Sequence, residues 1–242
     1  MAIGNVTPDS FYAGSRLMTA EGQIDTAVIV SWAQKALSDG AGILDIGACS
    51  TRPNSTPASE DEEWRRLAPA LEAIRIACPD VPLSIDTFRP SIARRALEQF
   101  GELIINDISG GSEEMYDLVS RLDVPYIFTF SGDYSRLSLL DAYPTSRWIL
   151  DPGFGFCGGV EADYACLRQM DSLRAYNRPV LVGVSRKSML YKPLGLTPET
   201  SLIPTQALHL YALEHGATIL RTHDVRDTFN IITLWSKIIS NS

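Results

Sequence analysis

Short apolar runs rich in β-branched residues alternate along this chain with longer amphipathic runs, and this alternation constrains the fold more than any other feature. The apolar runs predict strands near Ala2–Val6, Ile43–Gly47, Leu83–Asp86, Leu103–Ile108, Tyr126–Phe130, Trp148–Leu150, Val180–Val184 and Ile219–His223. The amphipathic runs predict helices near Thr26–Ser38, Glu60–Cys78, Ser91–Phe100, Glu113–Leu122, Glu161–Tyr176, Thr205–His215 and Val225–Ile239. Eight such units in 242 residues favour an α/β fold of the closed (β/α)8 TIM-barrel type over an open doubly wound sheet.

The connection between the fifth and sixth predicted strands is shorter than the others. Residues 131–147 read SGDYSRLSLLDAYPTSR, a polar segment that Pro144 interrupts. A parallel crossover needs about a dozen residues or more, so we expect this segment to complete it with one short helix near Leu137–Tyr143. The sequence contains no linker or repeat, and we expect a single domain over residues 1–242 with a shortened unit after strand 5.

Charge and cysteine content exclude several classes of function. The formal net charge is −8 and the pI is about 4.9, which argues against a nucleic-acid partner but not against a small anionic substrate held by a few local cations. No apolar run approaches the roughly 18 residues of a membrane span, and the N-terminus lacks the pattern of a signal peptide. The four cysteines fit no zinc pattern. We therefore expect a cytoplasmic protein with reduced thiols.

Polar residues stand at the carboxyl ends of nearly all the predicted strands, where a buried parallel strand should be apolar. They are Asn5, Asp86, Asn106, Asp107, Asp151, Ser185, Arg221 and His223. At any single strand end, a helix cap or a satisfied polar network is about as common as a functional site. Six strands with the same feature are hard to explain by capping, and in a barrel these ends converge on one mouth. The sequence therefore predicts a binding site for a small polar ligand there.

The residue types in this set divide into two kinds. Asp86, Asn106 and Asp151 suit a flat heterocycle rich in N–H donors. Arg186, Lys187, Arg221 and His223 suit an anionic oxygen such as a phosphate. The sequence shows no Ser-His-Asp set, no Cys-His pair and no Walker loop, and DPGFGFCGG does not match the dinucleotide-binding glycine pattern.

Seven motifs at these strand ends resemble the dihydropteroate synthase family. They are NVTPDSF (5–11), DIG-x-x-STRP (45–53), SIDTF (84–88), IINDISGG (104–111), DPGFGF (151–156), VGVSRKSM (182–189) and RTHDV (221–225). The motifs run in order along the whole chain. NVTPDSF, SRKS and R-x-HDV are highly specific in combination.

The resemblance implies a transferase of folate biosynthesis and a sulfonamide target. By this resemblance, the protein would join 6-hydroxymethyl-7,8-dihydropterin diphosphate to p-aminobenzoate and release diphosphate. Carried over by motif, the pterin residues would be Asp86, Asn106, Asp151 and Lys187, and Gly183 would allow close approach of the ring. The diphosphate residues would be Arg221, His223 and Asn5, with Asn5 also meeting Mg²⁺. The aminobenzoate site would contain Thr51, Arg52, Ser185 and Phe156. The resemblance also suggests a homodimer.

Several positions depart from the family pattern. Phe128-Thr129-Phe130 replaces a Met-His pair at the end of the fifth strand, and the segment after it is short. Because the first predicted strand begins at Ala2, we expect no N-terminal hairpin of the kind usual in the family. These changes affect the pocket wall and leave open a second hypothesis, a non-catalytic pterin-binding paralogue or partner subunit. A pterin-dependent methyltransferase fits less well, because methyl transfer needs no diphosphate clamp.

Overall fold

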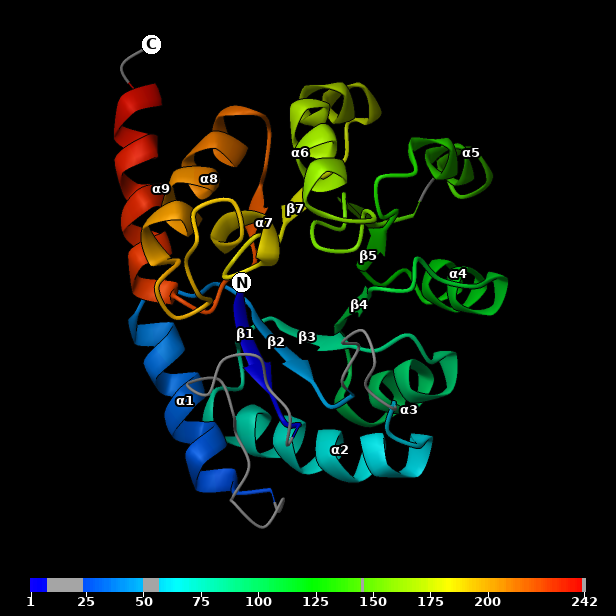
Figure 1. The fold of residues 1–242 in the computed structure, drawn as a ribbon. Helices are drawn as coiled ribbons and strands as arrows, with labels where there is room; N and C mark the ends of the chain where they lie inside the picture. Colours follow the sequence, from blue (N-terminus) through cyan, green and yellow to red (C-terminus); the bar gives the residue numbers. More distant parts are fainter. Residues whose placement is uncertain (8–23, 50–56, 145, 241–242) are drawn as a thin grey trace. The chain divides into compact units, whose positions relative to one another are not determined.

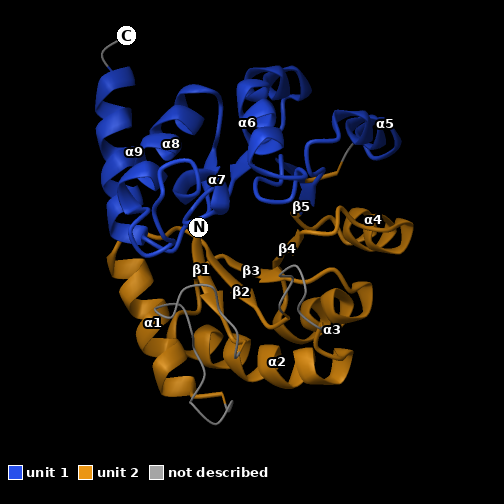
Figure 2. Cartoon of the chain, viewed as in Figure 1, with its two compact units in different colours: residues 1, 127–144, 148–242 blue, residues 2–126, 145–147 orange. Residues whose placement is uncertain are grey.

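The computed structural model describes residues 1–7, 24–49, 57–144 and 146–240 (Figure 1). These residues form two compact units (Figure 2). Unit 2 comprises residues 2–126 and 145–147, and unit 1 comprises residue 1 together with residues 127–144 and 148–242.

Unit 2 contains four parallel strands in register. They are β1 (Ala2–Asn5), β2 (Leu44–Gly47), β3 (Leu83–Asp86) and β4 (Ile104–Asp107). The pairing places Asn5 opposite Gly47, Gly47 opposite Asp86, and Asp86 opposite Asn106. Because parallel strands present aligned residues as one row, these four positions form a row across the carboxyl ends of the strands.

Each strand of unit 2 is followed by a helix. The helices are α1 (Thr26–Ser38), α2 (Glu60–Ala77), α3 (Pro90–Phe100) and α4 (Glu113–Arg121), and each packs on the next. The start of α2 is capped: Ser59 Oγ accepts from the Glu62 backbone N–H at 3.3 Å, and acids occupy the first four helical positions, as the helix dipole favours. The core between sheet and helices is apolar, with Leu44, Ile46, Ile85, Leu71 and Ile74 all fully buried.

Unit 1 continues the alternation of strands and helices. Its strands are β5 (Tyr126–Thr129, whose first residue is counted with unit 2), β6 (Trp148–Asp151), β7 (Leu181–Val182) and β8 (Ile219–Leu220). Its longer helices are α6 (Val160–Arg168), α8 (Leu202–Glu214) and α9 (Val225–Ile239). β7 pairs in parallel with β8, and Leu150 of β6 forms a parallel bridge with Val180.

The short connection after β5 folds as expected into little helical structure, namely the 3-10 turn η2 (Tyr134–Ser138) and the single turn α5 (Leu139–Ala142). Leu137 and Leu140 are buried, and Tyr143 stacks on Trp148 at 5.3 Å between ring centroids. Trp148 in turn lies 5.1 Å from Phe128. Buried leucines and aromatic contacts therefore pack this short connection against the strands of unit 1.

The helices of unit 1 differ from the prediction at two places. The run Glu161–Tyr176 is divided, because α6 ends at Arg168 and the 3-10 helix η3 (Met170–Tyr176) follows. A further single turn, α7 (Ser188–Tyr191), follows β7 and was not predicted, since four residues are too few for a helical period. Among the described residues, no helix is long and apolar enough to cross a membrane.

Candidate active site

The row at the carboxyl ends of the unit 2 strands contains three of the candidate residues. A methyl group at Gly47 would lie 3.4 Å from Asn5 Oδ1 and 3.5 Å from Asp86 Cβ, so the glycine leaves space between these two side chains. Asn106 Nδ2 donates to Asp45 Oδ2 at 3.1 Å, which fixes the amide orientation. Asp45 is fully buried, as expected for a supporting residue rather than a ligand. The structure thus places Asn5, Asp86 and Asn106 along one sheet edge.

Asp107, next to Asn106, belongs to a different network. Its carboxylate accepts hydrogen bonds from Ser109 Oγ at 2.6 Å and from Tyr126 Oη at 3.1 Å. The side chain is fully buried. These contacts suit a residue that orients its neighbours rather than one that contacts a ligand.

A buried ion pair supports the end of β3. Glu63, in the first turn of α2, is fully buried; it pairs with Arg89 and accepts from Thr87 Oγ1 at 2.6 Å. Arg89 also donates to the Ala58 carbonyl at 2.6 Å. The sequence pattern does not reveal this pair, because the acidic run before Trp64 is typical of an exposed first turn. Only the inward-facing position of Glu63 distinguishes it.

In unit 1, the turn after β6 surrounds Lys187. Asp151 Oδ1 accepts from the Gly153 N–H at 2.8 Å and Oδ2 from Thr129 Oγ1 at 3.4 Å. The Lys187 ammonium donates to the Phe154 carbonyl of the same turn. Thr129, which departs from the family pattern, therefore supports the Asp151 carboxylate instead of removing a contact from the site.

Burial and neighbouring charges change the pKa values of this cluster. Burial raises the pKa of Asp151, and the Lys187 ammonium opposes the rise. Burial lowers the pKa of Lys187 to about 8; Asp151 opposes this shift, whereas Arg221 adds to it. For His223, burial, followed by the charges of Arg221, Arg186 and Lys187, lowers the pKa to about 3. The imidazole is therefore neutral near pH 7 and can still donate one N–H.

The remaining unit 1 candidates lie around the same lysine. The His223 backbone N–H donates to Ser185 Oγ at 3.2 Å. A methyl group at Gly183 would lie 3.8 Å from both Lys187 Nζ and Arg221 Cβ. Lys187 Nζ also lies 5.0 Å from the centroid of the Phe156 ring, within the range of a cation–π contact. The structure brings this part of the predicted site together within one unit.

Arg186 differs from the prediction for the cationic residues. It was grouped with the donors to anionic oxygen, but its guanidinium forms a bidentate pair with Asp224, at 2.9 Å through Nε and 2.6 Å through NH2. The grouping is wrong because neighbouring residues in a turn point in different directions. Thr51 and Arg52 lie outside the described residues.

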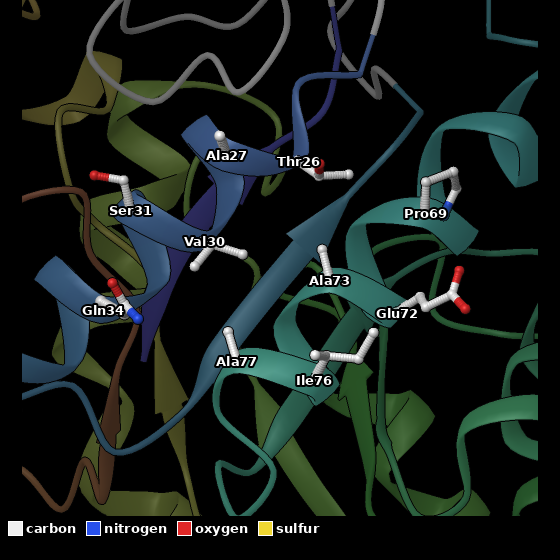
Figure 3. Close-up of a pocket in the computed structure, with 10 residues that line it drawn as sticks. All are labelled: Thr26, Ala27, Val30, Ser31, Gln34, Pro69, Glu72, Ala73, Ile76 and Ala77. Atoms are coloured by element: carbon white, nitrogen blue, oxygen red, sulfur yellow. The ribbon is translucent and has the colours of Figure 1, made fainter.

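A separate hollow lies between α1 and α2 in unit 2 (Figure 3). Its lining is made of Thr26, Ala27, Val30, Ser31, Gln34, Pro69, Glu72, Ala73, Ile76 and Ala77. These side chains include no pair of groups suited to acid–base work or to an anion, so the hollow is not a candidate active site.

Comparisons with known proteins identify the family of this chain. Residues 1–140 and 134–223 match the family described as pterin binding enzyme. The dihydropteroate synthase of Streptococcus pyogenes serotype M3 is 32% identical over 260 residues, covering 99% of this chain and 95% of that protein. The Folate synthesis bifunctional protein, mitochondrial, of Pisum sativum is 31% identical over 99% of this chain, which spans about half (53%) of that longer protein.

Solved structures show the same fold. Yersinia pestis dihydropteroate synthase, in a sulfonamide drug complex, gives a TM-score of 0.86 at 28% identity, covering 100% of this chain and 93% of that one. The structure of the Xanthomonas albilineans enzyme with 4-aminobenzoic acid gives a TM-score of 0.86 at 31% identity, and the match covers 98% of this chain and 91% of that one. The predicted (β/α)8 fold class is confirmed. The chain belongs to the dihydropteroate synthase family of pterin-binding enzymes.

Proposed function

We propose that this chain catalyses the dihydropteroate synthase reaction, in which 6-hydroxymethyl-7,8-dihydropterin diphosphate and p-aminobenzoate give 7,8-dihydropteroate and diphosphate. It is a transferase of folate synthesis. The observation that carries the proposal is the cluster of Asp151, Lys187 and Arg221 in unit 1, which combines a buried carboxylate with two cations. A pterin diphosphate needs both kinds of group, because its ring offers N–H donors and its tail is anionic.

Asp151 and Lys187 are proposed to bind the pterin ring. The carboxylate accepts from ring N–H groups, while the ammonium donates to a ring acceptor. Asp86 and Asn106 of unit 2 are proposed to contact the ring as well, on the strength of the family motifs. Gly183 has no side chain, and we propose that the ring approaches the backbone there.

Arg221 and His223 are proposed to bind the diphosphate. The guanidinium can form two parallel hydrogen bonds to phosphate oxygens. The neutral His223 imidazole can donate one N–H, and an adjacent anion would raise its pKa. Both groups neutralise charge that grows on the diphosphate as it leaves.

Mg²⁺ is proposed as the cofactor, with Asn5 as a protein ligand. The residues present fit this ion: Asn5 Oδ1 lies at the Gly47 gap beside the Asp86 side chain, and both offer the oxygen donors that Mg²⁺ prefers. Mg²⁺ usually takes one or two protein ligands and completes its shell with phosphate oxygens and water. When bound, it would add Lewis-acid neutralisation of the diphosphate.

The reaction needs no protein nucleophile. The C–O bond to diphosphate breaks, a C–N bond to the arylamine forms, and the amine loses a proton. The exocyclic carbon becomes electron-poor while it is conjugated with the ring, so a fixed carboxylate such as Asp151 stabilises it electrostatically. Ser185 and Phe156 are proposed to line the aminobenzoate site with Thr51 and Arg52, and a sulfonamide is expected to compete there.

The decisive test is turnover. Purified protein is incubated with pterin diphosphate, p-aminobenzoate and Mg²⁺, and dihydropteroate is measured. Product formation that Lys187→Ala abolishes supports the proposal. A folded protein that binds pterin diphosphate in calorimetry but forms no product is instead the non-catalytic paralogue, and absence of binding contradicts both functions.

A homodimer in the cytoplasm is also proposed. Four large apolar side chains of α9 are between 40% and 58% exposed, namely Phe229, Leu234, Ile238 and Ile239. An exposed apolar face of this kind often marks a protein–protein contact. Sedimentation of the native chain beside Leu234→Glu tests this, since the charge should favour the monomer. The four cysteines are free, as in a reducing compartment, and cell fractionation tests the location.

A further inference from the structure

The turns that follow β7 and β8 are joined by one ion pair, Arg186 with Asp224. Arg186 Nε donates to Asp224 Oδ2 at 2.9 Å and NH2 donates to Oδ1 at 2.6 Å, a bidentate arrangement. The side chains are only 7% and 10% exposed. A pair with this geometry and burial restricts the two turns far more than an exposed ion pair does.

The two turns carry the cationic part of the proposed site. Arg186 lies between Ser185 and Lys187, and Asp224 directly follows His223. The same two turns are also joined by the hydrogen bond from the His223 N–H to Ser185 Oγ. Any shift of Arg186 relative to Asp224 therefore moves Lys187 relative to His223.

The rest of the guanidinium is also committed to backbone groups. Arg186 NH1 donates to the Pro198 carbonyl at 2.8 Å and to the Glu199 carbonyl at 3.0 Å. The Arg186 backbone N–H donates to Thr205 Oγ1, in the first turn of α8, at 3.3 Å. The side chain and backbone of Arg186 together thus connect four segments of unit 1.

Two local costs accompany the pair. Arg186 has a φ of +57°, a left-handed conformation that is strained for a non-glycine residue. Asp224 is the N-cap residue of α9, yet its side chain makes no capping hydrogen bond. A capping aspartate would stabilise the helix, so the carboxylate is used for Arg186 at the expense of the helix. The left-handed turn directs the Arg186 side chain to Asp224, whereas Lys187 donates to the Phe154 carbonyl.

We infer that Arg186 and Asp224 are positioning residues for binding of the pterin diphosphate. The pair holds Lys187, Arg221 and His223 in one arrangement. It also neutralises Asp224, so that this carboxylate does not compete with the substrate for the Lys187 and Arg221 charges. This inference rests on the proposed roles of Lys187 and Arg221.

The test is Asp224→Asn in the full chain, because asparagine keeps the size and is an equally good N-cap. We expect the Kd for pterin diphosphate in calorimetry with Mg²⁺, and the KM for it, to rise about tenfold or more. We expect kcat to change by less than about threefold, because the reacting groups are retained. The matched control is Asp171→Asn, which weakens the exposed pair of Asp171 with Arg174 and should leave all three values unchanged.

A purely structural role predicts a different result. In that case Asp224→Asn lowers the melting temperature and the amount of active enzyme, with an unchanged KM and Kd, and the inference is overturned. If Asp224→Asn gives no folded protein, Arg186→Lys keeps the charge but not the bidentate geometry, and it should raise the same Kd. Arg221→Ala, measured in parallel, separates the two proposals. If it binds pterin diphosphate like the unaltered enzyme, the proposed roles fail; if it binds weakly and Asp224→Asn does not, only the positioning role fails.

Discussion

Replacing Gly183 with alanine separates the stability of the protein from its capacity to bind pterin. Gly183 directly follows β7, and a methyl group there would lie 3.8 Å from Lys187 Nζ, 3.8 Å from Arg221 Cβ and 4.0 Å from Arg221 Cδ. All three distances are ordinary van der Waals contacts. The unliganded protein can therefore accept the methyl group without moving its neighbours.

The structure gives opposite signs for the two effects. A glycine-to-alanine change at a compatible backbone position stabilises a protein by about 0.4–1 kcal/mol, since the unfolded chain loses freedom. We therefore expect an unchanged or slightly higher melting temperature. If the pterin ring approaches the backbone between Lys187 and Arg221, the methyl group overfills that space. Overpacking costs about 1–3 kcal/mol, which corresponds to a roughly 5- to 150-fold weaker Kd.

Calorimetric titration with pterin diphosphate and a thermal melt measure both quantities on the same samples. The matched control is Gly42→Ala, in unit 2, where a methyl group would meet no atom within 4 Å. It should leave the Kd unchanged. Binding of pterin diphosphate by Gly183→Ala at the affinity of the unaltered enzyme would refute the close approach of the ring at this backbone position. A large fall in melting temperature would refute the packing argument instead.

Three further predictions concern charge. Lys187 has a pKa lowered to about 8 by burial, so its charge is lost as the pH rises through 8. In calorimetry, the affinity for pterin diphosphate should fall as the pH rises from about 7.5 to about 9.5, a range that spans this pKa. A constant affinity would contradict the role of Lys187 in binding. His209 has a pKa lowered to about 4, so the unfolded state binds the proton more tightly. Lowering the pH from about 6.5 to about 4 should therefore reduce the free energy of unfolding by up to about 3 kcal/mol. In urea titrations, His209→Gln should lose less stability over this pH range than the unaltered protein. An equal loss in both proteins would exclude His209 as the source of the effect. Arg89→Met leaves the buried Glu63 without its counter-ion and should lower the free energy of unfolding by about 3 kcal/mol or more. A loss below about 1 kcal/mol, which is typical of an exposed ion pair, would show that this pair contributes little to stability.

The alternation of strands and helices was predictable because it is a local property. Each buried parallel strand is apolar on both faces, and each covering helix is apolar on one, so the two patterns differ within a short window. The polar strand ends of unit 2 were predictable for the same reason. Asn5, Asp86 and Asn106 interrupt apolar runs, and the parallel register then aligns them. The elements that escaped prediction were single turns such as α7, which are too short to have a period.

The sequence by itself determined the fold class, the family and the positions of the polar strand ends. Only the tertiary structure decided what neighbouring residues do there. Arg186 and Lys187 are adjacent cations, yet one pairs with a carboxylate 38 residues along the chain and the other donates to the turn after β6. The difference arises from one left-handed backbone conformation at Arg186. Likewise, the His223 imidazole is neutral near pH 7 because it is buried near three cations. Both depend on contacts between distant segments, and no short-range pattern in the sequence records them.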